Sequence, residues 1–173
     1  MKRRSVAVAL VTLAMLAFTP DIDACGDKSL APGGIRWQRA MAARYPASVL
    51  AYIPPTSRLP AASRELKLPE KLREVGHTYH EVSTLAELHA SVGTGQFNIV
   101  VADVTQVAEV QSTLRSTSPR VVVIPIAYKL TKAEARELAK QSRFVIKVPS
   151  RAVQYLNTVA EAVRSRTETS RQS

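Results

Sequence analysis

Residues 98–126 decide the fold class, and they read NIVVADVTQVAEVQSTLRSTSPRVVVIPI. Two segments rich in apolar residues, Asn98–Ala102 and Arg120–Ile126, flank a stretch whose apolar residues recur at helical spacing. Those residues are Val107, Val110 and Leu114. Continuous apolar strands are typical of a parallel sheet that is covered on both faces. The stretch therefore predicts a strand, a helix and a second strand joined by a right-handed crossover.

The same alternation continues on both sides of this unit. Three more strands are expected at Ser48–Ile53, His77–Val82 and Phe144–Val148. Two of the helices between strands begin at capping boxes, Thr84–Glu87 and Thr131–Glu134, in which a threonine and a glutamate cap the helix start together. Five strands that alternate with helices predict a single α/β domain of (βα)5 type, with three layers and a parallel five-stranded sheet.

The second strand, His77–Val82, is more polar than the others and is expected at an edge of the sheet. That position gives the strand order 2-1-3-4-5, which is the order of flavodoxin-like folds. The domain is expected to span residues 47–164. A lead-in precedes it at residues 25–46, and a flexible polar tail follows it at residues 165–173.

The N-terminus has the parts of a secretory signal. The basic stretch Lys2–Arg4 precedes an apolar run, Val6–Phe18, which ends before Thr19 and Pro20. The run is too short to cross a membrane, which takes about 20 residues, but it suits the core of a signal peptide. We therefore expect residues 1–24 to be a signal peptide that is removed on export.

Cys25 would then begin the mature chain, and it is the sole cysteine, so the domain has no disulfide of its own. Acylation of Cys25 as a lipoprotein, or retention of an uncleaved anchor, are the alternatives to plain cleavage. The polar stretch Pro20–Asp23 fits a lipoprotein box poorly, which favours plain cleavage. The expected location is the periplasm or the cell envelope.

From Ala47 to Arg164 the chain resembles the receiver domains of two-component response regulators. The resemblance rests on Asn98–Asp103, similar to a third strand that ends in the phosphoacceptor aspartate, and on Phe144–Pro149, similar to a fifth strand with its lysine and proline. In that family the aspartate takes a phosphoryl group, helped by Mg²⁺ that acidic residues after the first strand hold. A hydroxyl group after the fourth strand and the lysine then respond to the modification.

The chain departs from the receiver pattern in the residues that the chemistry needs. Ile53–Pro55 holds no acidic residue, and one aspartate alone is a poor magnesium site because Mg²⁺ requires several hard oxygen ligands. Tyr128 stands where the family has a serine or threonine, and one residue separates Lys147 from the following proline. An exported protein also meets no cytoplasmic kinase. Phosphorylation of Asp103 is not expected, so the resemblance concerns the fold.

Ligands of such a sheet bind beyond the carboxyl ends of its strands. The candidate residues there are Asp103, Tyr128, Lys129, Lys147 and Ser150. In one interpretation Asp103 and Lys147 form an ion pair that only organises the loops. In a second, Lys147, Lys129 and the amides of the helix that begins at Ser150 hold a small anion, because helix N-termini favour anions. In a third, Asp103, Tyr128 and Lys147 are the acid–base groups of an enzyme.

The three histidines, His77, His80 and His89, predict no metal site. In a strand His77 and His80 point to opposite faces, and zinc takes three or four ligands, so these side chains are interpreted as surface histidines. The turn Gly93–Gly95 lacks the lysine and the serine or threonine of a phosphate-binding loop. We expect no metal and no cofactor.

The formal net charge is +10, which favours anionic partners such as phospholipid head groups, cell-envelope polymers or nucleic acid. The basic residues are scattered, so most are interpreted as a solvated surface and nucleic acid is the least favoured partner. The favoured function is an exported, non-catalytic binding or interaction module with a pseudo-receiver fold, for an envelope protein or a small anionic ligand. A single-lobe solute-binding protein and an enzyme are the alternatives, and the oligomeric state stays open.

Overall fold

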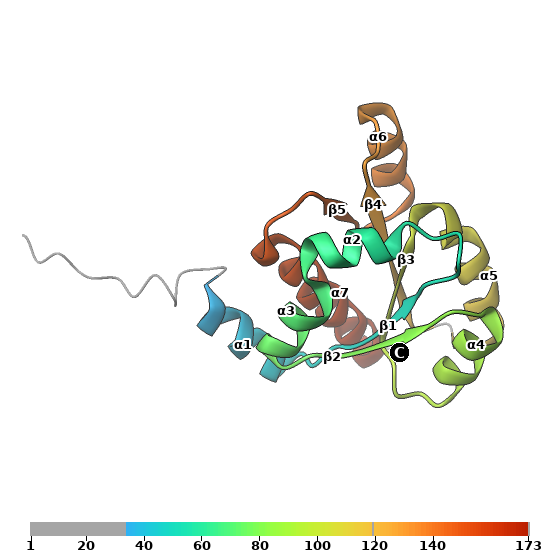
Figure 1. The fold of residues 1–173 in the computed structure, drawn as a ribbon. Coiled ribbons are helices and arrows are strands. Elements are labelled where there is room, and N and C mark those ends of the chain that lie inside the picture. Colours follow the sequence, from blue (N-terminus) through green and yellow to red (C-terminus); the bar gives the residue numbers. More distant parts are fainter. Residues whose placement is uncertain (1–33, 119, 173) are drawn as a thin grey trace, which may run out of the picture.

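A five-stranded parallel sheet forms the centre of the protein (Figure 1). The computed structural model describes residues 34–118 and 120–172. Its strands lie in the order β2-β1-β3-β4-β5, and every neighbouring pair is parallel. The strands are β1 (Ser48–Tyr52), β2 (Thr78–Val82), β3 (Ile99–Asp103), β4 (Val122–Tyr128) and β5 (Ile146–Val148). This confirms a single flavodoxin-like α/β domain with the predicted strand order.

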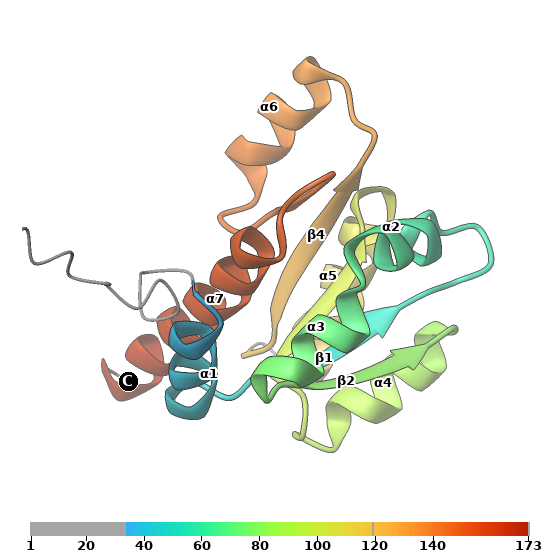
Figure 2. The same cartoon turned by 60° about the vertical axis from the view of Figure 1, so that its left-hand side comes forward.

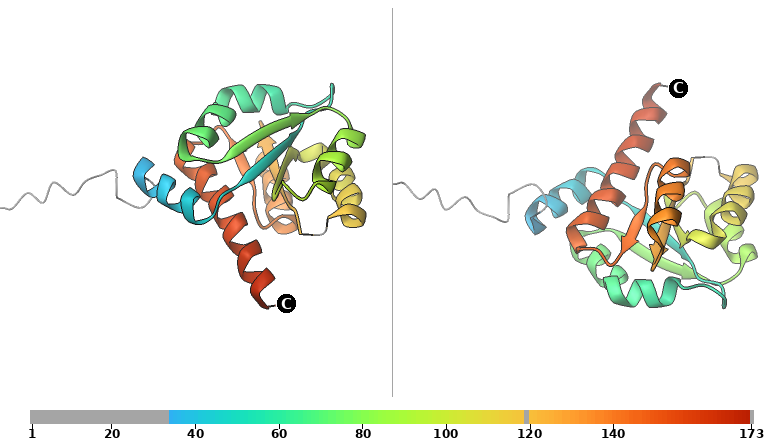
Figure 3. Two further views of the ribbon diagram at one scale, coloured as in Figure 1. Left: turned by 90° about the horizontal axis from the view of Figure 1, so that it is seen from below. Right: turned by 90° about the horizontal axis from the view of Figure 1, so that it is seen from above.

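Helices cover both faces of the sheet, as right-handed crossovers between parallel strands require. The helices are α1 (Ile35–Arg44), α2 (Leu59–Leu66), α3 (Leu68–Val75), α4 (Leu85–Gly93), the 3-10 turn η1 (Val104–Gln106), α5 (Val107–Thr117), α6 (Lys132–Gln141) and α7 (Ala152–Gln172). Figure 3 shows α1, α2, α3 and α7 on one face of the sheet and α4 and α5 on the other. The domain therefore has the three layers that its sequence predicts.

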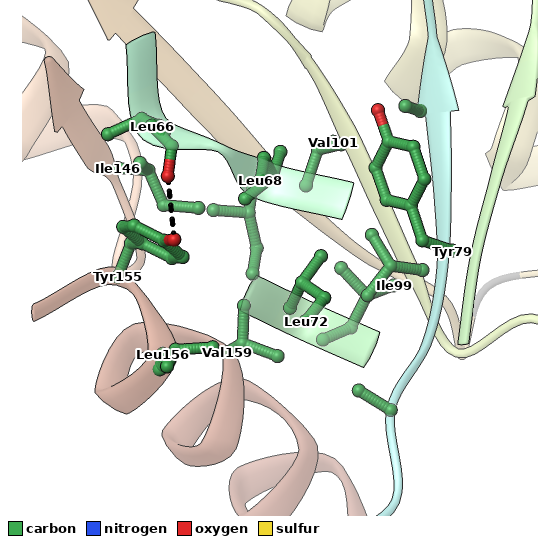
Figure 4. Close-up of a cluster of buried hydrophobic side chains, with 14 of the residues drawn as sticks. Leu66, Leu68, Leu72, Tyr79, Ile99, Val101, Ile146, Tyr155, Leu156 and Val159 are labelled. Carbon is green, nitrogen blue, oxygen red and sulfur yellow. Dashed lines mark hydrogen bonds between the residues drawn. The ribbon is translucent and has the colours of Figure 1, made fainter. Parts of the chain in front are cut away.

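Two hydrophobic cores lie on opposite faces of the sheet. Alternation along β3 sends Ile99 and Val101 into the larger core and Val100 and Ala102 into the smaller one. In the larger core, Leu68 and Leu72 of α3 pack against the sheet beside Leu156 and Val159 of α7 (Figure 4). Leu68 and Leu72 belong to the crossover between β1 and β2, so this polar stretch of the sequence contributes a large part of the core.

The two chain ends of the described region pack together. Gln38 of α1 donates a hydrogen bond from Nε2 to Oδ1 of Asn157 on α7, at 2.6 Å. Ala42 of α1 is buried in the larger core, so the last part of the predicted lead-in belongs to the fold. Residues 165–172, predicted as a flexible tail, continue α7 as a helix.

The predicted signal peptide, residues 1–24, and Cys25 lie outside the described residues. Within residues 34–118 and 120–172, no helix combines the length and the apolar character needed to cross a membrane. Export and the fate of Cys25 stay predictions.

Helix α6 stands beyond the carboxyl end of β4 instead of lying along the sheet (Figure 2). Leu138 is its one buried side chain. The sheet face beside α5 is therefore covered less completely along β4, where Val121 and Val123 are half-buried and line a groove with Leu114. Strand β5 follows α6 and forms the edge of the sheet opposite to β2.

Candidate functional site

The five predicted site residues lie at the carboxyl ends of three strands, as the fold requires. Asp103 ends β3, Tyr128 ends β4 with Lys129 directly after it, Lys147 lies in β5, and Ser150 precedes α7. Two of them, Lys147 and Ser150, line the same cavity.

The carboxylate of Asp103 is occupied by hydrogen bonds that organise two loops. Its side chain is 3% exposed. Oδ2 accepts from the backbone N–H of Arg58 at 3.0 Å, and Oδ1 accepts from the backbone N–H and the hydroxyl of Thr105 at 3.0 and 2.9 Å. Arg58 precedes α2 and Thr105 lies in η1, so this single carboxylate fixes the segments that follow β1 and β3.

Asp103 and Lys147 do not form the ion pair that one interpretation of the sequence placed here. Their strands are not neighbours, because β4 lies between β3 and β5. Their side chains also belong to opposite faces of the sheet. Val101, Ile146 and Val148 point to the larger core. Asp103 lies two residues after Val101 and shares its face, whereas Lys147 alternates with Ile146 and Val148 and points to the other face. The acid–base trio of Asp103, Tyr128 and Lys147 is not assembled either.

Tyr128 and Lys129 interact with each other. The Lys129 ammonium nitrogen lies 5.0 Å from the centroid of the Tyr128 ring, a cation–π arrangement. Lys129 has a φ of 53°, a left-handed conformation that turns the chain at the end of β4 toward α6. Neither residue lines the cavity that contains Lys147 and Ser150.

That cavity lies at the outer edge of β5 and against α7, and its volume is about 350 Å³. It is lined by Val145, Ile146, Lys147, Pro149, Ser150, Gln154, Tyr155 and Thr158. Lys147 is the only charged residue among them, and its side chain is exposed. No residue of the wall is a carboxylate, so nothing in the lining repels an anionic occupant. Lys147 alternates with Ile146 and Val148, so its side chain leaves β5 on the face away from α7 and carries its charge at the open edge of the strand.

Two polar groups in the wall have hydrogen-bonding capacity left. The Ser150 Oγ atom is buried and has no hydrogen-bond partner among the described residues. Gln154 accepts from the backbone N–H of Arg151 through Oε1 at 3.1 Å, which leaves its amide NH₂ group to donate. Buried polar atoms are paired in most proteins, so an unpaired hydroxyl beside a cavity calls for a missing partner.

The start of α7 adds to this electrostatic preference. Ser150 lies two residues before Ala152, the first residue of that helix. The first N–H groups of a helix carry partial positive charge and have no partner within the helix. Ser150 and the first turn of α7 thus present donors and partial positive charge to the same space, and Lys147 adds a full positive charge at the edge of β5 beside it.

His77 is buried in the fold, whereas His80 is exposed to solvent. His77 is 4% exposed, so its interpretation as a surface residue is wrong. Its Nδ1 atom accepts from the backbone N–H of Ala47 at 3.1 Å, and burial lowers the pKa of this imidazole to about 4. His80 is exposed, and its ring contacts Phe97 edge-on at 5.5 Å. No group of three or more potential metal ligands occurs among the described residues.

Sequence reasoning missed Gln154 and Thr158, which lie one helical turn apart and face the edge of β5. It also missed Gln106 of η1, whose buried Oε1 has no partner among the described residues. The sequence does contain a pattern that could have indicated Gln154 and Thr158: they are polar, four residues apart, and lie beside the apolar stripe of α7. No model of a known protein family matches this chain, and no curated protein matches it.

Proposed function

We propose that this protein is an exported, non-catalytic binding module of the cell envelope, and that it holds a small anionic ligand in the cavity between β5 and α7. The observation that carries the proposal is the buried, unpaired Ser150 hydroxyl in a wall whose only charged residue is Lys147. An anion with two or more oxygens would accept from this hydroxyl and from the Gln154 amide. Because β5 is an edge strand, the long Lys147 side chain would reach around its open edge to pair with this charge, and charge-assisted hydrogen bonds are the strong ones.

The size of the cavity restricts the ligand. A volume of about 350 Å³ lies near the lower end of the range of small-molecule sites, which is roughly 300–1,000 Å³. Inorganic phosphate and small carboxylates fit this space, and both supply acceptor oxygens for the Ser150 hydroxyl and the Gln154 amide.

A role without catalysis fits the state of Asp103. A carboxylate that receives three hydrogen bonds and is almost fully buried would have to give them up before reacting. In this proposal Asp103, at the receiver-like end of β3, has a structural role, and the ligand binds at the edge of the sheet beside β5 instead of at its centre.

An NMR titration tests the proposal. Both hydrophobic cores lie within the described residues, so a chain of residues 26–173 keeps the fold and lacks the apolar N-terminal run. Isotope-labelled protein is titrated with inorganic phosphate and, separately, with succinate at low ionic strength. We expect amide shifts confined to β5 and the first turns of α7.

Two variants and a matched control sharpen the test. Lys147→Gln and Ser150→Ala are each expected to weaken binding about tenfold, which corresponds to about 1.4 kcal/mol. Lys129→Gln removes the same charge from the neighbouring strand end and should leave the affinity unchanged. Shifts spread over the whole surface, or an equal loss in the K129Q and K147Q chains, would mean that the anions respond only to net charge and would overturn the proposal.

A further inference from the structure

Helix α1 differs from the other helices in the kind of surface that it exposes. It contains three arginines, Arg36, Arg39 and Arg44, and no acidic residue. All three arginines are exposed, together with Ala40 and Ala43. The buried residues Gln38 and Ala42 lie on the opposite side of the helix. Every charged residue on the solvent side of α1 is therefore an arginine, and we call this side the basic strip.

Apolar side chains flank this strip. Ile35 is the only exposed large hydrophobic residue among those described, with 37% of its surface accessible. Trp37 is half-buried on the other flank of the helix. At helical spacing, Ile35 and Trp37 thus border the arginines on either side. Helices that lie in a membrane interface combine arginine or lysine with residues such as tryptophan and leucine that enter the head-group boundary. In α1 the face opposite the arginines packs on the protein, so Ile35 and Trp37 at the borders of the strip are the residues that can make the apolar contact.

The positive charge is not spread evenly around the fold. Helices α4 and α5, on the other face of the sheet, contain Glu87 and Glu109 against a single arginine, Arg115. An anionic surface would therefore orient the molecule with α1 toward it. Helix α3 lies beside α1, where the Nε atom of Arg39 donates to the Glu74 carbonyl oxygen at 3.3 Å. It adds no net charge, because Lys71 and Arg73 are balanced by Glu70 and Glu74.

The place of α1 in the chain points the same way. It is the first helix of the described region, and the apolar run Val6–Phe18 and Cys25 precede it in sequence. Ten residues of extended chain span at most about 35 Å, so Ile35 stays near any bilayer that Cys25 approaches. Nucleic acid would use the arginines but would leave Ile35 and Trp37 without a role.

We propose that α1 is a membrane-contact surface, with Arg36, Arg39 and Arg44 binding the phosphates of anionic phospholipids while Ile35 and Trp37 enter the head-group region. The planar guanidinium group suits phosphate because it can donate two parallel hydrogen bonds. This surface is separate from the cavity between β5 and α7, so either proposal can fail without the other.

Trp37 supplies a built-in probe, because it is the only tryptophan in the chain. The chain of residues 26–173 is mixed with vesicles of phosphatidylglycerol and phosphatidylcholine, or of phosphatidylcholine alone. We expect the Trp37 emission to move to shorter wavelength and the protein to sediment with the anionic vesicles only. Raising the salt from 0.1 M to 1 M shortens the screening length from about 10 to about 3 Å, and it should release the protein.

Matched variants separate a specific surface from net charge. Basic residues near a membrane contribute about 1 kcal/mol each, so R36Q/R44Q is expected to weaken vesicle binding about 30-fold. K132Q/R136Q removes the same charge from α6 and should stay within twofold of the parent chain. A Lys147→Gln chain should bind vesicles normally, which keeps this test independent of the anion cavity.

Three results would overturn the proposal. One is an equal loss of vesicle binding in R36Q/R44Q and K132Q/R136Q, which would show that only net charge acts. Another is sedimentation with no change in Trp37 emission, because α1 would then lie away from the lipid. The third is binding to a short DNA duplex, lost in R36Q/R44Q, without any binding to anionic vesicles.

Discussion

Replacing Asp103 by asparagine is expected to destabilise the fold by about 2–3 kcal/mol. The side chain keeps its size, so no cavity forms and the effect comes from hydrogen bonding. The amide oxygen can still accept from Thr105, but the amide NH₂ group then faces the backbone N–H of Arg58. The asparagine NH₂ group and the Arg58 N–H would then be two donors that face each other with no acceptor between them, in a site that is almost closed to water.

The magnitude follows from the three bonds that the carboxylate receives. A hydrogen bond to a charged group contributes about 1.5–3 kcal/mol, and a buried donor left unpaired costs about 1–3 kcal/mol. Asparagine loses the bond from Arg58 outright and weakens the two bonds from Thr105, because the acceptor is no longer charged. Thr105→Ala removes only the hydroxyl bond and is expected to cost about 1 kcal/mol.

Urea unfolding at pH 7, followed by far-UV circular dichroism, measures these differences. In thermal unfolding of a domain of this size, the same 2–3 kcal/mol corresponds to a change in Tm of about 4–12 °C. Glu65→Gln is the control, since it makes the same change on an exposed residue of α2 and should stay within about 0.5 kcal/mol of the parent. A D103N protein as stable as the E65Q protein would refute a structural role for this carboxylate.

Burial lowers the pKa of His77 to about 4, so the unfolded chain, with a histidine pKa of about 6.5, binds more protons between these two values. This contribution to stability is complete above about pH 6.5 and falls by about 2.5 kcal/mol on going to pH 4.5. In urea unfolding we expect H89Q to keep that loss and H77Q to lack it, and the reverse pattern would contradict the assignment. Tyr155→Phe removes the hydroxyl that donates to the Leu66 carbonyl at 2.9 Å, at an expected cost of about 1–2 kcal/mol. Tyr128→Phe, which breaks no such bond, should change the unfolding midpoint much less; equal effects would count against this role of Tyr155.

Patterns that are local in sequence predicted the sheet and several helix starts. Both capping boxes form as expected, with Thr84 accepting from the backbone N–H of Glu87 and Thr131 from that of Glu134. The polar strand β2 lies at the edge because an edge strand has fewer neighbours to bury its side chains. These features depend on residues within a few positions of each other, so periodicity and composition are enough to find them.

Contacts between distant segments were not predictable in the same way. The bond between Gln38 and Asn157 joins residues 119 positions apart, and no local pattern shows which surface a terminal helix will find. This contact incorporates part of the lead-in into the fold. The position of α6 was missed for a similar reason, since its capping box predicts where it begins but not where it packs.

The candidate site was predicted only in part, and the failures share a cause. Lys147 and Ser150 were found because strand ends meet at one edge of a parallel sheet. The contact of Asp103 with the segment after β1 could not be predicted because its donor is the backbone N–H of Arg58, and a backbone donor leaves no trace in the residue type. The burial of His77 was not predicted for the same reason, because its imidazole accepts a hydrogen bond from a backbone group, the N–H of Ala47.

The state of Asp103 also explains why an open cavity lies at the edge of this sheet. In flavodoxin-like folds the crevice for ligands opens where the chain reverses direction between the first and third strands. Here the Asp103 carboxylate binds the segment that follows β1 and draws it against the end of β3. Strand β5, by contrast, has no neighbour on its outer side, and the Ser150 hydroxyl beside it is left without a partner. Loosening the first contact, as D103N does, should therefore lower stability without weakening anion binding at Lys147, because the two places share no hydrogen bond.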